Sequence, residues 1–213
     1  MSYIGHGGKE IVERVIASPS EAKERIKELK QIAVTGRIAR ECINIAYGFF
    51  TPLEGFMGKA DVAAVCEKMT LANGTLWSMP VVFDIASEEI SEKGIKKGDS
   101  VLLVYQDKAL AILEVEQIFD YDSTKMAQAV LGTTDIKHPG VRMFNELKDT
   151  FIGGEVTLVN IPKFSPPFDK FWYTPKQLRK KFIEKGWERI VAHQTRNVPH
   201  SGHEWLMKGA WFS

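Results

Sequence analysis

Apolar residues recur at helical spacing near the start of the chain. Residues 18–21, SPSE, form a capping-box sequence with proline at the first helical position. The apolar positions that follow are Ala22, Ile26, Leu29 and Ala33. This spacing predicts an amphipathic helix over these residues. Farther along, Asp61 is expected to cap a second, shorter helix that runs through Val65 and Met69.

Runs rich in Val, Ile and Leu predict strands in the middle of the chain. The runs are Met79 to Ile85, Val101 to Tyr105, Ala109 to Phe119 and Glu155 to Asn160. Residues 106–108 are short enough for a hairpin turn, and Gly153-Gly154 is expected to form a turn before the last run. The first ~160 residues thus predict a β-rich domain with peripheral helices.

The amino-acid composition changes near Pro162, where residues 161–175 contain four prolines. So many prolines favour an extended connector, so we place a domain boundary here and expect domains at residues 1–168 and 169–213. Aromatic side chains in this stretch could stack on bases, but packing against adjoining domains is the favoured interpretation. They are Phe164, Phe168, Phe171, Trp172 and Tyr173.

Beyond the connector, the pattern predicts a helix, a strand, a loop and another helix. A second capping box, Thr174 to Gln177, opens a helix that is expected to stop at Gly186. Arg189 to Ala192 is expected to be a short strand, and Glu204 to Trp211 a helix. In α/β folds, ligands gather where a strand ends and the next helix begins, which places residues 194–204 at a ligand site.

Composition and charge exclude several classes of protein. The 28 Lys and Arg nearly balance the 27 Asp and Glu, so no broad basic field of the kind that nucleic acid requires is expected, and anion binding must be local. A 44% hydrophobic content indicates a globular chain. We expect a cytoplasmic protein with no membrane span, because neither a secretory leader nor ~18 consecutive apolar residues is found. Cys42 and Cys66 lack metal-site spacing and are expected to be reduced thiols in a core.

Residues 194–204, QTRNVPHSGHE, hold the highest density of side chains that can donate hydrogen bonds to a ligand. If a helix begins near Pro199, His200 and His203 share a face of its first turn, where unpaired N–H groups and the helix dipole favour an anion such as phosphate. Arg196 adds a planar fork of donors. Neutral donors on the same loop are Gln194, Thr195 and Asn197.

Alternatives to an anion site are weaker. No P-loop or dinucleotide-binding glycine pattern occurs. His193 could act as a base on Thr195, but a role in geometry is favoured. Two histidines three apart could bind zinc, yet Glu204 directly follows His203 and is expected to point away, so no metal site is predicted.

Three ordered segments make the chain resemble sulfate adenylyltransferase, also called ATP sulfurylase. In that family a QTRN loop followed by PxHxxHE matches residues 194–204. A GAFSPLxGFM-like segment matches residues 48–57, GFFTPLEGFM, and a GTxDxxHPGV-like segment matches residues 132–141, GTTDIKHPGV. These segments span most of the chain.

The resemblance implies a mixed α and β fold, with a PUA-like β-barrel up to about Phe168 and then part of a Rossmann-like nucleotidyltransferase domain of HxGH type. It implies conversion of ATP and sulfate to adenosine 5′-phosphosulfate and pyrophosphate, with Mg²⁺ accompanying ATP. Gln194 and Arg196 would hold sulfate. Thr195, Arg196 and Asn197 would form the active-site loop, and His200 and His203 would stabilise the transition state.

The chain departs from the family pattern at a few places. Val198 stands where proline is usual, and His193 where an aromatic residue is usual. The family also continues well beyond the length of this chain, so activity of the 213 residues alone stays open. A homo-oligomer or a missing C-terminal part is expected. The alternative is a non-catalytic binding or assembly module whose barrel contacts a partner; the near-neutral charge weighs against RNA.

Overall fold

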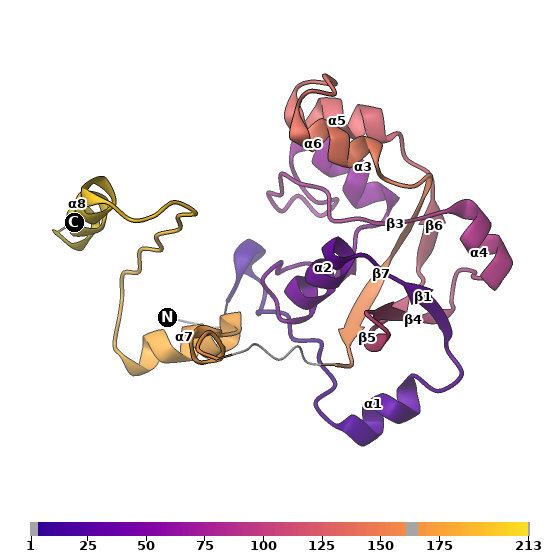
Figure 1. The fold of residues 1–213 in the computed structure, drawn as a ribbon, viewed down its shortest axis with the longest axis horizontal. Coiled ribbons are helices and arrows are strands. Elements are labelled where there is room, and N and C mark those ends of the chain that lie inside the picture. Colours follow the sequence, from indigo (N-terminus) through magenta and orange to yellow (C-terminus); the bar gives the residue numbers. More distant parts are fainter. Residues whose placement is uncertain (1–3, 161–165, 213) are drawn as a thin grey trace.

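The computed structural model describes residues 4–160 and 166–212, which form a barrel-like domain followed by a separate helical segment (Figure 1). The strands are β1 (Lys30–Ala33), β2 (Gly55–Phe56), β3 (Phe83–Ile85), β4 (Ser100–Tyr105), β5 (Lys108–Glu114), β6 (Gln117–Phe119) and β7 (Thr150–Leu158). The helices of the domain are α1 (Pro19–Arg25), α2 (Gly36–Ala46), α3 (Lys59–Lys68), α4 (Ser87–Lys93), α5 (Ser123–Leu131) and α6 (Pro139–Asn145). The C-terminal segment holds α7 (Pro175–Glu184) and α8 (Ser201–Phe212).

Strand β7 is the hub of the sheet. Among the described residues it pairs antiparallel with β2, β3, β5 and β6, and the sheet order runs β1-β4-β5-β7-β2. At the far edge, β1 pairs parallel with β4, with Ile32 opposite Leu103. The sheet curves around the main apolar core, and α3, α5 and α6 gather at one end of it (Figure 1).

The predicted turn at Gly153-Gly154 is wrong, because both glycines lie inside β7. A Cβ on Gly154, whose φ is 156°, would lie 1.8 Å from the Glu114 carbonyl oxygen, and one on Gly55 would lie 1.9 Å from the Gly154 carbonyl oxygen. Gly55 and Gly154 therefore allow three strands to approach one another closely, and Gly154 does not reverse the chain.

Other strand predictions are confirmed with changed bounds. The run Ala109 to Phe119 is broken into β5 and β6, and the strand expected from Met79 begins at Phe83, after Pro80. Proline cannot donate to a strand ladder, which explains the late start. The hairpin turn is confirmed: Gln106 and Asp107 have φ of 49° and 59° between β4 and β5.

The first helix is shorter than its apolar spacing predicts. Ser18 caps α1 as expected, but the helix ends at Arg25, and Glu28 adopts a left-handed φ of 66°. Residues 30–33 instead form β1, because Ile32 gains a buried place in the core by pairing with β4. Tertiary packing here overrides helical periodicity.

Two further helix details were not foreseen. Asp61 does not cap α3, which begins after Gly58; its side chain accepts a hydrogen bond from the Ala72 N–H at 2.8 Å. Helix α2 was not predicted at all, although Thr35 caps it and it buries Ile38, Cys42 and other apolar residues against the sheet.

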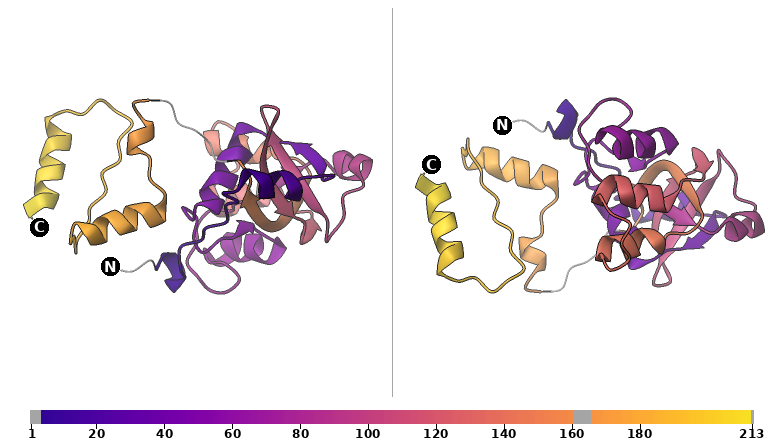
Figure 2. Two further views of the ribbon diagram at one scale, coloured as in Figure 1. Left: turned by 90° about the horizontal axis from the view of Figure 1, so that it is seen from below. Right: turned by 90° about the horizontal axis from the view of Figure 1, so that it is seen from above.

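The C-terminal segment lies beside the domain in all three ribbon views (Figure 2). Trp172 packs edge-on against Tyr47 at 5.1 Å between ring centroids, as the packing interpretation predicts, whereas Phe168 and Phe171 are exposed. Phe164 lies outside the described residues. The capping box at Thr174 is confirmed, and Gly186 with φ of 64° follows the end of α7.

The predicted strand Arg189 to Ala192 is wrong in this structure. These residues are not assigned to a strand in the described segment 166–212, where no strand occurs. A strand needs a neighbour for its N–H and C=O groups, and the nearby elements, α7 and α8, offer none.

Candidate anion-binding site

His200 starts helix α8 and orients its first turn. Its carbonyl oxygen accepts from the His203 N–H at 2.9 Å, and its Nδ1 accepts from the Gly202 N–H at 3.1 Å. The same arrangement recurs at α6, where Nδ1 of His138 accepts from the Gly140 N–H at 3.1 Å. The histidine thus acts as an N-cap, and its Nε2 is left for another partner.

The ring of His203 faces the loop rather than the solvent. Its Nδ1 accepts from the backbone N–H of His200 at 3.3 Å, and its Nε2 lies 3.4 Å from Oγ1 of Thr195. Because Nδ1 is an acceptor, the neutral ring carries its proton on Nε2, which can donate. The rings of His200 and His203 meet at 4.1 Å between centroids.

A tight turn holds Thr195 in place. Its Oγ1 accepts from the Asn197 N–H at 3.1 Å, a local turn that serine and threonine often form. Thr195 and His203 are half-buried. Gln194 and Arg196 are exposed and make no hydrogen bond to any described residue, so their donors are available to a ligand.

The structure therefore brings together Thr195, Asn197, His200 and His203, and leaves Gln194 and Arg196 beside them. The residues in this group supply N–H and O–H donors at a helix N-terminus, and such an arrangement suits an anion. The sequence could not show that Thr195 contacts His203. The two residues are eight positions apart, and the turn at Thr195–Asn197 brings them together.

The donor set does not fit direct binding of Mg²⁺. No cluster of three His, Cys, Asp or Glu residues suited to a metal occurs in the described ranges. Glu204 pairs with Lys208 at 2.6 Å instead of facing the loop. Mg²⁺ prefers carboxylate and phosphate oxygens, so these residues do not form a magnesium site.

An apolar groove lies next to this site. The extended residues 187–193 and helix α8 enclose a cavity of about 810 Å³. Large apolar side chains among its lining residues are exposed: Leu206 is 66% exposed and Trp211 is 86% exposed. Apolar exposure of this extent on one face indicates a contact surface.

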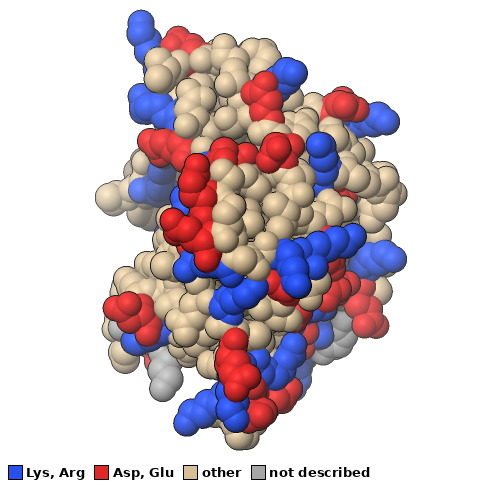
Figure 3. Space-filling view, turned by 90° about the vertical axis from the view of Figure 1, so that its right-hand side faces the viewer, with Lys and Arg blue, Asp and Glu red and all other residues tan. Residues whose placement is uncertain are grey.

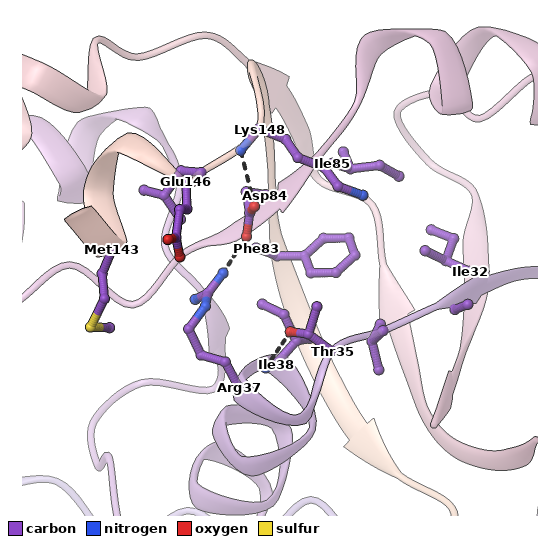
Figure 4. A pocket seen from close by; sticks show the side chains of 13 residues that line it. Ile32, Thr35, Arg37, Ile38, Phe83, Asp84, Ile85, Met143, Glu146 and Lys148 are labelled. Atoms are coloured by element: carbon purple, nitrogen blue, oxygen red, sulfur yellow. Dashed lines mark hydrogen bonds and ion pairs between the residues drawn. The ribbon is translucent and has the colours of Figure 1, made fainter. Parts of the chain in front are cut away.

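A second cavity, of about 280 Å³, lies between β1 and β3, where the barrel is not closed (Figure 4). Arg37 reaches from α2 across it to Asp84 on β3, and also pairs with Glu41 at 3.2 Å. Burial raises the pKa of the Glu41 carboxyl, and Arg37 partly offsets this rise. The i, i+4 spacing of Arg37 and Glu41 was a signal that sequence reasoning did not use.

The thiols behave as expected for the core. Cys42 is fully buried, and burial raises its pKa far above the usual range. Cys66 is half-buried, and burial raises its pKa as well. The Tyr121 phenol, which is hydrogen-bonded to Cys66, has a pKa raised to about 12, chiefly by burial. Neither thiol is poised as a nucleophile.

Charges of both signs are mixed on the face shown in Figure 3, where no large field of one sign appears. In the described part of the chain, no helix is long and apolar enough to span a bilayer.

Two protein families match consecutive parts of the chain. Residues 3–161 match the PUA-like domain family, and residues 169–213 match the ATP-sulfurylase family. The second match contains the whole loop 194–204.

Curated relatives share one name. The chain is 40% identical over 207 residues to the sulfate adenylyltransferase of Ignicoccus hospitalis, which covers 96% of the chain and 53% of the relative. It is 41% identical over 210 residues to that of Thermococcus onnurineus, covering 96% and 52%, and 34% identical to that of Archaeoglobus fulgidus, covering 98% and 50%. The chain spans about half the length of these relatives.

A solved structure shares the fold. The hexameric APS kinase from Thiobacillus denitrificans matches with a TM-score of 0.73 and 22% identity over 98% of this chain and 37% of that one. At this identity the likeness supports the fold alone.

Proposed function

We propose a reaction for this chain from its family: it belongs to the sulfate adenylyltransferases, with a PUA-like domain and part of an ATP-sulfurylase domain. We propose that it supplies the phosphate- and sulfate-binding loop for the conversion of ATP and sulfate to adenosine 5′-phosphosulfate and pyrophosphate. The observation that carries this proposal is the turn of Thr195 held against His203 at the start of α8.

The chemistry asks for donors rather than for a base. A sulfate oxygen attacks the α-phosphorus of ATP, the bond from that phosphorus to the bridging oxygen breaks, and pyrophosphate leaves. Sulfate is a dianion at neutral pH, so no proton must be removed from it. The obstacle is repulsion between two anions and the charge that develops as the anhydride breaks, which aimed N–H donors reduce.

Each loop residue takes a role in this proposal. Gln194 and Arg196, whose donors are free of described partners, would hold sulfate. Thr195, Arg196 and Asn197 would shape the loop around the phosphates. His200 and His203 would donate to phosphate oxygens as charge builds up, His203 through Nε2.

The finer features of the domain belong to the same proposal. We place the division between domains near residue 168 and assign residues 169–213 to a Rossmann-like domain of HxGH type. Magnesium would arrive on the phosphates of ATP as part of the substrate. Cytoplasmic location, the absence of a nucleic-acid partner, and assembly with further copies or with the remaining half of the family's chain stay predictions.

The test joins this chain to the second half of the Thermococcus onnurineus relative and measures sulfate-dependent exchange of pyrophosphate into ATP. We expect exchange, and we expect Arg196→Ala and His203→Ala each to lower turnover by about 10²–10³, or about 2.7–4 kcal/mol, with the fold retained. Lys208→Ala, on the same helix but paired with Glu204, is the matched control and should leave turnover unchanged.

Near-normal turnover in either loop variant would remove the loop from the mechanism. If the chimera folds but shows no sulfate-dependent exchange, the chain is a non-catalytic module instead.

A further inference from the structure

His193 is a third imidazole at this site. Its ring meets the ring of His203 edge-on, with centroids 5.7 Å apart and planes at 80°. This separation and angle lie within the range that aromatic pairs prefer. The contact joins the last residue before the loop to the helix that follows it.

The ring of His203 needs such support because its polar contacts are long. The bond from the His200 N–H to Nδ1 is 3.3 Å, and the separation of Nε2 from Thr195 Oγ1 is 3.4 Å. Both exceed the 2.7–3.2 Å typical of strong N–H···O bonds. The ring of His200, whose centroid lies 4.1 Å away, is a further contact on this imidazole, but bonds of this length restrain tilting or flipping about χ2 only weakly.

One of these bonds is also the one that a ligand would replace. When Nε2–H of His203 donates to an anion, it must turn away from Oγ1 of Thr195. The ring contact with His193 is separate from both hydrogen bonds, so we expect it to persist through that exchange.

We propose that His193 is a positioning residue of this site. Its ring holds the His203 imidazole in place while the Nε2–H group of His203 exchanges one hydrogen-bond acceptor, Oγ1 of Thr195, for another, a substrate oxygen. The inference rests on the proposed function for its catalytic consequence, but not for its geometry. It differs from a role as a base: in the described structure His193 makes no hydrogen bond to Thr195, and Oγ1 of Thr195 already contacts Asn197 and His203.

The first test reads the geometry in the chain itself, without any activity. The imidazole nitrogen and carbon NMR signals of His203 are recorded at one fixed pH for the unchanged chain, His193→Phe and His193→Ala. Phenylalanine keeps the edge-on ring and removes the nitrogens. We expect one Nε2–H tautomer in the unchanged chain and in His193→Phe, and averaged, broadened signals in His193→Ala.

Two controls separate this effect from misfolding. His138 caps α6 as His200 caps α8, so its signals should be the same in every variant. His6→Phe makes the same replacement on the barrel, where the ring centroids of His6 and Trp77 are 6.1 Å apart. This variant should not alter the signals of His203. Signals of His203 that stay sharp and unchanged in His193→Ala, with His138 intact, would overturn the proposal; so would His193→Phe behaving like His193→Ala.

The second test uses the chimera with the Thermococcus onnurineus half. Misplacement of a catalytic group lowers turnover rather than binding, so His193→Ala should reduce kcat by roughly 10- to 100-fold with little change in KM for ATP or sulfate. His193→Phe should restore most of kcat. A chimera without any exchange would reject the proposed function and leave the NMR result to decide the role of His193, whereas an active chimera indifferent to His193→Ala would reject the positioning role.

Discussion

Gly202 sets the start of α8 because a side chain there would press on the capping histidine. A Cβ at this position would lie 3.0 Å from Cε1 and 3.2 Å from Nδ1 of His200. We expect Gly202→Ala to displace the ring and break the cap, a loss of about 1 kcal/mol that offsets the gain of about 0.5–1 kcal/mol that alanine otherwise brings inside a helix. Circular dichroism during thermal unfolding, together with the His200 NMR signals, would measure this.

Gly209 provides the control on the same helix. A Cβ there meets nothing within 4 Å, so Gly209→Ala should raise helix stability by about 0.5–1 kcal/mol. If both variants stabilise the helix alike, the cap does not depend on the space beside Gly202.

Glu41 makes a pH-dependent contribution to stability. Burial raises the pKa of its carboxyl above the ordinary 4.5, so the folded chain binds this proton more tightly than the unfolded chain does. The resulting stabilisation is complete below the ordinary pKa and is lost as pH rises through the raised folded pKa. Glu41→Gln should therefore gain stability relative to the unchanged chain between pH 4 and pH 7, measured by urea unfolding.

A suitable comparison is Glu92→Gln, which makes the same replacement on the exposed face of α4. A gap between Glu41→Gln and the unchanged chain that stays constant or closes with rising pH would contradict the assignment.

The kind of ligand could be predicted from the residue types in the loop, but the contacts between these residues could not. The donors of residues 194–203 indicate an anion site because their chemistry is local. The meeting of Thr195 with His203 depends on the turn at Asn197, and the contact of His193 with His203 depends on the path of the chain into α8. Neither follows from spacing.

At the scale of elements, the β4–β5 hairpin carries strain that one substitution can relieve. Gln106 and Asp107 both adopt left-handed φ values, as a two-residue turn of this hand requires, and glycine is favoured there. Asp107→Gly should stabilise the domain by about 0.5–1 kcal/mol in equilibrium unfolding. Lys108→Gly, one residue later in β5, should destabilise it, and equal effects would mean that the turn is not strained.

The elements that sequence predicted well are those with a local signal. The Ser18 cap places α1, the capping box at Thr174 places α7, and the hairpin follows from its short connection. The errors arise where a partner strand decides: β1 forms from residues that also fit a helix, because β4 lies beside it, whereas residues 189–192 fit a strand but have no neighbour. Gly153 and Gly154 fit a turn until the strands around them are known.

For the whole molecule, the apolar groove beside α8 should govern self-association. Trp211 and Leu206 line it and are exposed, so the chain should associate as its concentration rises, because association removes this surface from water. A Leu206→Gln, Trp211→Gln double variant should stay monomeric in sedimentation velocity experiments. Phe171→Gln, an exposed aromatic residue outside the groove, is the control, and equal association of all three chains would show that the groove is not involved.

The central place of β7 also bears on how the protein is made. A ribosome delivers the chain from the N-terminus, and β7 is the last of the described strands to emerge. Until Leu158 is free, β2, β3, β5 and β6 lack the partner that joins them. Nascent chains that end before β7 should therefore remain open to proteases and chaperones, and the domain should become resistant abruptly, in one late step of translation.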